Sequence, residues 1–168
     1  MHLIVTRSFP PELGGMQSLM WGLARELSKN FMIKVFADHF ENHKDFDEQV
    51  SFSIERVGGI KLLRKYRKAQ LVNEFIKENK VESVIADHWK SLELIRSNKK
   101  KYCLIHSKEI NHHKGTNLNK RVLNVLNNVE TIVANSEYTK NLAISLGIKQ
   151  DKIIVINPGV DPVEELEN

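Results

Sequence analysis

The chain has little of what several protein classes require. Its 168 residues include a single cysteine, Cys103, which excludes an internal disulfide framework. No hydrophobic run approaches the roughly 20 residues of a membrane-spanning helix. No signal-peptide core follows Met1, so we expect a cytoplasmic protein. The length leaves room for one domain of ordinary size, typically about 150 residues.

Proline is scarce as well. The four prolines occupy positions 10, 11, 158 and 162, so no Pro-rich linker divides the chain. Between them, short β-branched or aromatic segments alternate with helical patterns, which is typical of βαβ units. We therefore predict an α/β fold with one doubly wound, mainly parallel sheet of about seven strands and helices on both faces.

The expected strands cover residues 3–6, 31–37, 50–57, 83–86, 102–106, 131–135 and 152–156. The expected helices cover residues 16–29, 61–78, 90–97, 117–127 and 137–146, and residues 38–49 are expected to form a loop. In helix 61–78 the spacing predicts a core-facing apolar face made of Leu62, Tyr66, Ala69, Val72 and Ile76. It also predicts a basic stripe that faces away from the core, made of Lys61, Arg64, Lys65 and Lys68.

Two common nucleotide-binding motifs are absent. Neither GxGxxG nor GxxxxGK[ST] occurs, which argues against a dinucleotide dehydrogenase and a P-loop NTPase. Gly14 and Gly15 nevertheless follow the first strand and open a helix whose first residues carry no carboxylate. The positive end of that helix is free for an external anion such as a phosphate, although a plain flexible turn explains the two glycines equally well.

Polar residues also follow two later strands. His88 comes after the fourth strand, and His106 and Glu109 come after the fifth. Ligands of open α/β sheets bind beyond the carboxyl ends of the strands, where these groups could bind hydroxyls or move protons. For each histidine taken alone, a structural or surface role is the simpler interpretation.

No metal site is expected. Cys103 and His106 have an odd spacing on one strand and so face opposite sides of the sheet. The adjacent pair His112 and His113 lacks the spacing of metal ligands. Cys103 has no partner base and is interpreted as a small buried hydrophobic residue.

Three segments, in order along the chain, resemble the amino-terminal domain of glycosyltransferase family 4. Residues 9–16, FPPELGGM, followed by LAREL at 23–27, are similar to the family's F-P-P-x-x-G-G opening and L-A-R-x-L helix. Residues 133–139, VANSEYT, are similar to its V-x-x-S-x-x-T segment. Residues 152–161, KIIVINPGVD, resemble its K-I-x-V-I-x-x-G-V-D signature before the interdomain hinge.

The resemblance implies half of an enzyme. The family consists of retaining, sugar-nucleotide-dependent transferases built from two Rossmann-like domains around a cleft. Residues 1–161 would be the acceptor-side domain and 162–168 the start of a linker or tail, with the carboxyl-terminal donor-binding domain absent. The implied co-substrate is a nucleotide sugar and the acceptor a sugar or a lipid-linked molecule, with no metal. This fragment is expected to be inactive alone.

The resemblance also implies roles for single residues. Gly14 and Gly15 would approach the donor phosphates through their backbone amides. His106 would lie by the donor sugar as a catalytic residue, with Glu109 as its companion. This chain has Ser107 where glycine is common in the family.

Three further positions are implied to bind substrate or phosphate. His88 falls in a stretch similar to the family's acceptor-side loop. Ser136 lies in the V-x-x-S-x-x-T segment, and Asp161 lies in the signature before the hinge.

Two other kinds of function stay open. One is a stand-alone nucleotide- or anion-binding module without chemistry. The other is a basic module whose stripe, Lys61, Arg64, Lys65 and Lys68, contacts an anionic membrane surface, although a solvated helix face is the simpler interpretation. The net charge of +4 favours anionic partners in general. Nucleic acid is not expected, because no aromatic residues interleave the lysines.

Overall fold

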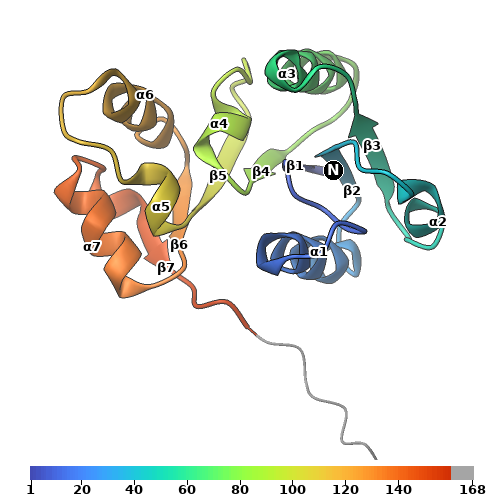
Figure 1. Ribbon diagram of the computed structural model, residues 1–168, viewed down its shortest axis with the longest axis horizontal. Coiled ribbons are helices and arrows are strands. Elements are labelled where there is room, and N and C mark those ends of the chain that lie inside the picture. The colour runs from blue at the N-terminus through green and yellow to red at the C-terminus, as the bar shows by residue number, and fades with distance from the viewer. Residues whose placement is uncertain (160–168) are drawn as a thin grey trace, which may run out of the picture.

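The computed structural model describes residues 1–159, and these form one seven-stranded sheet between layers of helices (Figure 1). All six strand pairings are parallel, in the order β3-β2-β1-β4-β5-β6-β7. The strands are β1 His2–Val5, β2 Ile33–Asp38, β3 Ser53–Val57, β4 Ser83–Ala86, β5 Lys100–Ile105, β6 Thr131–Ala134 and β7 Ile153–Val155. The predicted α/β architecture is confirmed.

The helices are α1 Gly15–Ser28, α2 His43–Asp47, α3 Lys61–Glu78, α4 Trp89–Leu92, α5 Ser107–Ile110, α6 Asn117–Leu126 and α7 Glu137–Ser145, with a short 3-10 turn at Gln150–Lys152. Two of them, α2 and α5, fall where the sequence analysis expected no helix. Helix α4 ends earlier than expected because the side chain of Asn73 forms hydrogen bonds with the backbone groups that follow the helix. Asn73 donates to the carbonyl of Leu94 and accepts from the amide of Arg96.

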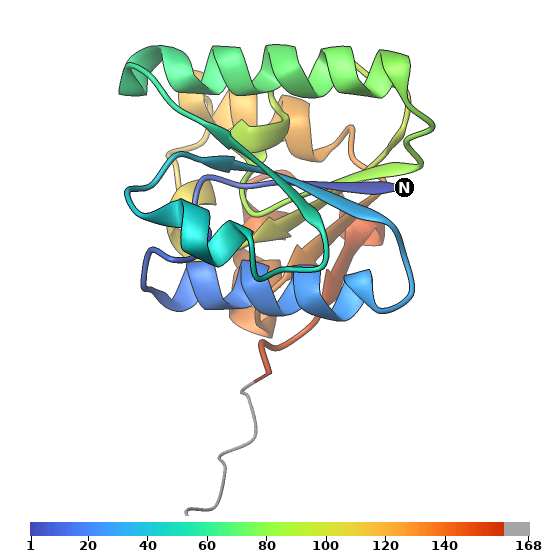
Figure 2. The same cartoon turned by 90° about the vertical axis from the view of Figure 1, so that its right-hand side faces the viewer.

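The helices cover the two faces of the sheet unequally. We call the side packed by α3, α4, α5, α6 and α7 the α3 face, and the side packed by α1 and α2 the α1 face. Figure 2 shows α3 and α1 on opposite sides of the strands. Successive side chains of a strand point to opposite faces of the sheet. In β5, Cys103 and Ile105 are fully buried on the α3 face. Tyr102 and Leu104 are half-buried on the α1 face.

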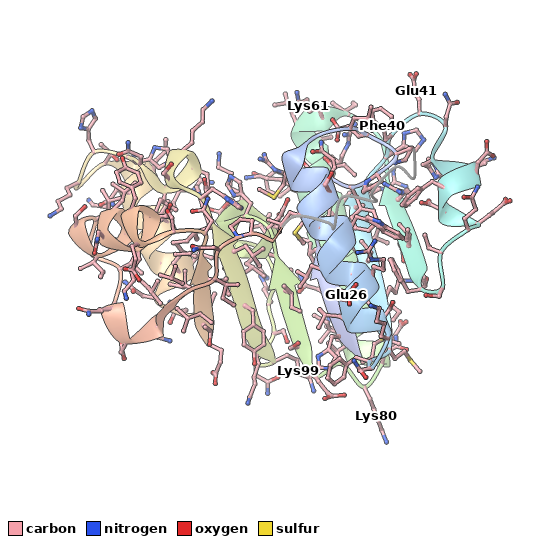
Figure 3. All side chains as sticks on the ribbon, turned by 90° about the horizontal axis from the view of Figure 1, so that it is seen from below. Glu26, Phe40, Glu41, Lys61, Lys80 and Lys99 are labelled. Atoms are coloured by element: carbon pink, nitrogen blue, oxygen red, sulfur yellow. The ribbon has the colours of Figure 1, made fainter. Side chains whose placement is uncertain are left out.

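Half of the α1 face has no helix over it. The view from below in Figure 3 meets α1 but no helix over the neighbouring strands β4 and β5. A groove of about 900 Å³ runs there along the strands, bounded by α1 on one side and by residues 156–159 on another. Its lining is mostly apolar and includes Leu23 of α1, Ile85 of β4 and Leu104 of β5.

Helix α3 corrects the expectation for its two sides. Lys68, predicted to face away from the core, is 4% exposed, whereas Leu62 and Tyr66, predicted to be buried, are 82% and 54% exposed. The reason is that α3 starts beyond the end of the strands, so its first turn has no sheet to pack on. Lys68, one turn further on, reaches back to the carbonyl of Thr6 and the carboxylate of Asp38 at the ends of β1 and β2.

Within residues 1–159, no helix is both long enough and apolar enough to cross a membrane.

Candidate active site at the carboxyl edge of the sheet

The parallel register brings the segments after β1, β4, β5 and β6 to one edge, which we call the carboxyl edge. Val5, the last residue of β1, pairs with Phe36 of β2 and with Ala86, the last residue of β4, so β1 and β4 end level and β2 continues to Asp38 at the same edge. The strand order reverses between β1 and β4, which is the point where doubly wound sheets bind ligands. Gly14, Gly15, His88, His106 and Ser136 all follow strands that end at this edge, as predicted.

The carboxylate of Asp87 forms hydrogen bonds that link the two loops at the switch point. One of its carboxylate oxygens accepts from the Thr6 hydroxyl at 2.8 Å and from the Arg7 amide at 3.2 Å, and the other accepts from the Ser91 hydroxyl at 3.1 Å. Asp87 and Thr6 are both buried. This network ties the loop after β1 to the loop after β4, so the two loops form one rigid floor for the site.

The glycine pair starts α1 with unused donors. Gly14 is the residue that precedes the helix, no side chain caps it, and the first turn carries no acid. A Cβ added at Gly15 would meet no atom within 4 Å, whereas one at Gly14 would lie 2.4 Å from the end of the Gln17 side chain. Gly15 also has no positive φ, so neither packing nor backbone strain in this chain requires a glycine there. The open space and the free amides suit an anion that approaches the backbone closely.

Aromatic packing and an arginine hold the loop before the glycines in place. Phe9 is buried and makes edge-on contacts with Trp21, Phe46 and Phe52. Arg56 donates to the Pro10 carbonyl at 2.5 Å and pairs with Asp47 at 2.6 Å. Phe46 and Asp47 belong to α2, which the sequence analysis expected to be a loop. The position of the glycine pair therefore depends on a helix that is distant from it in the sequence.

His88 caps the short helix α4. Its Nδ1 accepts from the Lys90 amide at 2.9 Å, which fixes that nitrogen as unprotonated. Burial first, and then the positive charges of Arg7 and Lys90 and the nearby imidazoles of His106 and His112, lower the pKa of His88 to about 3. The ring is therefore neutral near pH 7 and can donate a hydrogen bond only from Nε2.

His106 directly precedes α5 and carries a buried polar atom that no described residue satisfies. Burial lowers the pKa of His106, and Asp87 opposes that shift, so the ring is neutral near pH 7. Its Nε2 is buried and, among residues 1–159, has no hydrogen-bond partner. An unpaired buried nitrogen costs free energy unless a ligand or water satisfies it.

The carboxylate of Glu109 caps a helix and is not a free acid. Its carboxylate accepts from the backbone amide of His106 and thereby holds the first turn of α5. Burial raises the pKa of Glu109, hydrogen bonds from the backbone amides of His106 and of Glu109 itself oppose the rise, and the charge of Asp87 adds to it. The backbone carbonyl of Glu109 also accepts from the indole of Trp89 at 2.9 Å, which locks α5 to α4.

Ser136 is engaged in capping α7. Its hydroxyl oxygen accepts from the Thr139 amide at 3.2 Å, and the Thr139 hydroxyl donates to the side-chain oxygen of Asn135 at 2.6 Å. The serine thus presents the start of α7 to the edge rather than a free hydroxyl. Asp161, the last of the predicted positions, lies outside the described residues.

The apolar groove of the α1 face opens at this site. His106 and Asn135 line its end at the carboxyl edge, together with Leu19, which lies one turn inside α1 from Gly15. The other end reaches His2 and Lys99 at the amino ends of the strands. The groove therefore joins the part of α1 from Leu19 onward with His106, and Gly14 and Gly15 lie about one turn before this lining.

The sequence analysis missed several charged residues of this edge. Asp38 receives Lys68 and lies 3.4 Å from Arg64, so these two members of the expected stripe bind the end of β2. Arg7 and Lys90 lie near His88, because they act on its pKa. Only their position in the sequence could have identified Arg7 and Lys90, since both follow strands at the switch point.

Cys103 is fully buried and burial raises the pKa of its thiol, as its interpretation as a hydrophobic residue requires. Among residues 1–159, no group of three or more His, Cys, Asp and Glu side chains is arranged to hold a metal ion.

One family model matches most of the chain. The family model described as Glycosyltransferase Family 4 matches residues 13–164. No protein in the curated set matches this sequence.

Among solved structures, Anabaena HepE in complex with UDP-glucose has a TM-score of 0.69 at 17% identity, over 96% of this chain and 44% of that one. A glycosyltransferase from Rickettsia africae has a TM-score of 0.69 at 19% identity, over 95% of this chain and 43% of that one. Sucrose-phosphate synthase from Thermosynechococcus elongatus has a TM-score of 0.72 at 14% identity, over 95% and 48%. At these identities the likeness concerns the fold, and the chain spans less than half the length of each of these three structures.

Proposed function

The chain belongs to glycosyltransferase family 4, and from that premise we propose that it is the amino-terminal half of an enzyme that transfers a sugar from a nucleotide-sugar donor to an acceptor with retention of configuration. A carboxyl-terminal half would hold the nucleotide, so residues 1–168 would be inactive alone. One structure that shares the fold is a complex with UDP-glucose, which supports a nucleotide sugar as the donor.

The observation that carries this proposal is His106, which lines the carboxyl end of the groove and whose buried Nε2 has no partner among residues 1–159. A neutral ring with its proton on Nε2 can donate to a hydroxyl of the donor sugar, which would satisfy the buried nitrogen. The uncapped start of α1 lies at the same edge, about one turn before Leu19, which lines the groove. A diphosphate at Gly14 and Gly15 would therefore place its sugar toward His106.

Sugar transfer requires stabilisation of the negative charge that develops on the leaving diphosphate. The bond between the anomeric carbon and a diphosphate oxygen breaks, and the diphosphate takes the electron pair. The acceptor oxygen forms the new bond on the same face, and its proton passes to the departing diphosphate oxygen. Backbone amides and the positive end of α1 at Gly15 would stabilise the leaving diphosphate, where the negative charge grows. Glu109 would act as a positioning residue, since it holds the backbone of His106. His88 would lie on the acceptor side, offering Nε2–H to a hydroxyl.

The test compares two lengths of protein. Residues 1–168 are incubated with UDP-, GDP- and ADP-sugars and a panel of sugar and lipid-linked acceptors, and a longer protein that includes the carboxyl-terminal half is assayed in parallel by mass spectrometry. We expect transfer only from the longer protein, and loss of that transfer in His106→Ala. Turnover by residues 1–168 alone would overturn the proposal that they are half an enzyme. Absence of transfer from the longer protein, with every donor, would overturn the transferase function itself.

We also propose peripheral association with an anionic membrane surface, which a specific observation favours. Four large apolar side chains at the start of α3 are more than half exposed, namely Ile60, Leu62, Leu63 and Tyr66. Lys61 is exposed among them, and Lys65 is half-buried. Apolar side chains that enter the interface beside lysines that meet lipid phosphates are the combination that membrane-surface helices use. Arg64 and Lys68 are not part of this surface, because both bind Asp38.

A further inference from the structure

A second cavity lies at the same edge of the sheet, under α3 on the α3 face. Its volume is about 350 Å³, within the roughly 300–1,000 Å³ of small-molecule sites. Its walls come from the ends of β1 and β2, from the first half of α3, and from α4 and α6. Six cationic side chains line it: Arg7, Lys61, Lys65, Lys68, Lys90 and Arg121. We call this cavity the basic pocket.

The carboxylates around the basic pocket do not balance its charge. Asp38 lines it and binds Lys68. Glu93 accepts two hydrogen bonds from Arg121, at 2.6 and 2.8 Å, and lies 3.7 Å from Lys65. When Asp87 is counted with these two acids, the six cations still exceed the three carboxylates.

Three of the cations remain unpaired. Within residues 1–159, the side chains of Arg7, Lys61 and Lys90 form no ion pair with any carboxylate. They come from three separate segments, the loop after β1, the start of α3 and the start of α4. Their convergence on one cavity is therefore a product of the fold and not of one basic run in the sequence.

This convergence has an electrostatic cost. Burial lowers the pKa of Lys90, and repulsion from Arg7, Arg121 and Lys65 lowers it further. Burial also lowers the pKa of Lys68, against the attraction of Asp38. A bound anion would reverse the repulsion, because each cation would then face an opposite charge.

The basic pocket adjoins the candidate active site through Arg7. Arg7 lines the pocket, and its charge lowers the pKa of both His88 and Lys90, so it lies near His88 as well. A molecule anchored in the pocket would therefore extend toward His88. The pocket is separate from the glycine pair, neither of whose residues lines it.

We propose that the basic pocket binds a phosphate or diphosphate group carried by the acceptor. That the ligand is the acceptor rests on the proposed function, whereas binding of phosphate is independent of it. Lys90 and Lys61 offer ammonium donors and Arg7 a guanidinium fork, which suits phosphate oxygens. The phosphate can belong to a soluble ester or to a lipid headgroup.

The test measures binding of inorganic pyrophosphate to the 168-residue chain by titration calorimetry at low ionic strength. Arg7→Gln/Lys90→Gln removes two unpaired charges and no ion pair of the fold. We expect its affinity for pyrophosphate to fall at least tenfold. The matched control Lys80→Gln/Lys99→Gln removes two charges at the opposite edge of the sheet (Figure 3) and should leave the affinity within about twofold. Melting followed by circular dichroism checks that both variants are folded.

Two further arms separate this site and its ligand sources. Gly15→Val should keep the pyrophosphate binding that Arg7→Gln/Lys90→Gln loses, since the glycine pair lies outside the pocket. Phosphatidylcholine vesicles that contain phosphatidic acid test the lipid source. If the chain binds these vesicles through the pocket, pyrophosphate displaces it and Arg7→Gln/Lys90→Gln abolishes the binding. Pyrophosphate binding without displaceable vesicle binding assigns a soluble phosphate ester.

Equal affinities for the pocket variant and its control, or no binding of either probe, would overturn the basic pocket as a phosphate site. Such a failure leaves the transferase assay untouched. Conversely, a pocket that binds pyrophosphate in a protein whose longer form transfers no sugar would refute the proposed function alone.

Discussion

On the α3 face, five helices bury both ends of the sheet, and Ile105, Leu126 and Ile132 have no exposed surface. On the α1 face, α1 and the short α2 cover β1, β2 and β3, whereas the strands from β4 to β6 line an open groove. Parallel sheets are normally covered on both faces. The difference indicates that the α3 face supplies most of the stability of this chain, and that half of the α1 face is left open along the groove.

The two openings of the carboxyl edge differ in the same way. The groove of the α1 face is mostly apolar and is lined at its end by His106, whose Nε2 has no partner among residues 1–159, whereas the basic pocket of the α3 face gathers six cations. A donor sugar and a phosphate-bearing acceptor would need these different surroundings. The predictions that follow test this division between the faces.

The largest effect is expected at the start of α1. In a protein that includes the carboxyl-terminal half, Gly15→Val should lower transfer at least about 100-fold, the scale of losing one preorganised backbone donor, because its side chain occupies the space for the phosphate. The fold should persist, because a Cβ at Gly15 meets no atom within 4 Å. Gly22→Val is the matched control, since Gly22 lies in the same helix with equally open surroundings. Activity and melting temperature are measured together for both. Near-normal transfer in a folded Gly15→Val protein would withdraw the phosphate role of the glycine pair.

The two faces can be compared directly on one strand. Ile105→Ala should cost about 3 kcal/mol of unfolding free energy, because it leaves a cavity in the closed core. Leu104→Ala, the adjacent residue on the open groove, should cost only about 1 kcal/mol, since its side chain is already half in water. Urea unfolding of the 168-residue chain measures both. Equal costs would mean that the α1 face is as closed as the α3 face.

His88 should make stability depend on pH. The folded chain keeps this imidazole neutral down to about pH 3, whereas the unfolded chain protonates it below about pH 6.5. The unfolded state therefore binds more protons in that window, so stability falls as the pH falls, by about 2 kcal/mol between pH 7 and pH 5. His88→Asn keeps a cap for α4 and removes the titration.

Urea unfolding of the parent and of His88→Asn at both pH values isolates this contribution. His106, whose pKa is also lowered, accounts for part of any slope that remains. The assignment to His88 fails if both proteins lose the same stability.

The smallest effect concerns the outer side of α3. Ile60→Ser/Leu63→Ser should weaken binding to anionic vesicles by about 1 kcal/mol for each residue, because each loses part of its apolar burial in the interface. Neither residue lines the basic pocket, so phosphate binding should not change. Leu13→Ser is the control, since Leu13 is 95% exposed elsewhere on the molecule. Equal vesicle binding by all three proteins in a sedimentation assay would leave α3 as a solvated helix face.

Some features of the site were already readable in the sequence. Gly14, His88, His106 and Ser136 could be placed at one edge, because each follows a strand and parallel strands end together. The resemblance to glycosyltransferase family 4 was confirmed by the family model over residues 13–164. Asp161 stays a prediction, since it lies outside the described residues.

Other features could not be read there. The sequence analysis expected Lys68 on the outer side of α3, because periodicity orders residues around a helix but does not reveal where the sheet ends beneath it. Glu109 and Ser136 look like free polar groups in the sequence, whereas the structure uses both as caps. Helix α2 was missed because its stability comes from contacts of Phe46 and Asp47 with distant residues, which no local pattern shows.

Local patterning thus determined the strands, most of the helices and the edge to which the polar residues go, because side-chain alternation and glycine placement act over a few residues. Tertiary structure alone decided which half of the α1 face stays open, that His106 Nε2 is left without a partner among residues 1–159, and that Arg7, Lys61 and Lys90 meet in one pocket. These outcomes depend on the strand order and on the crossover from β3 to β4, which bring together residues more than 80 positions apart. Burial and electrostatic repulsion arise only once these residues are brought together in the fold, so no single segment of the sequence reveals them.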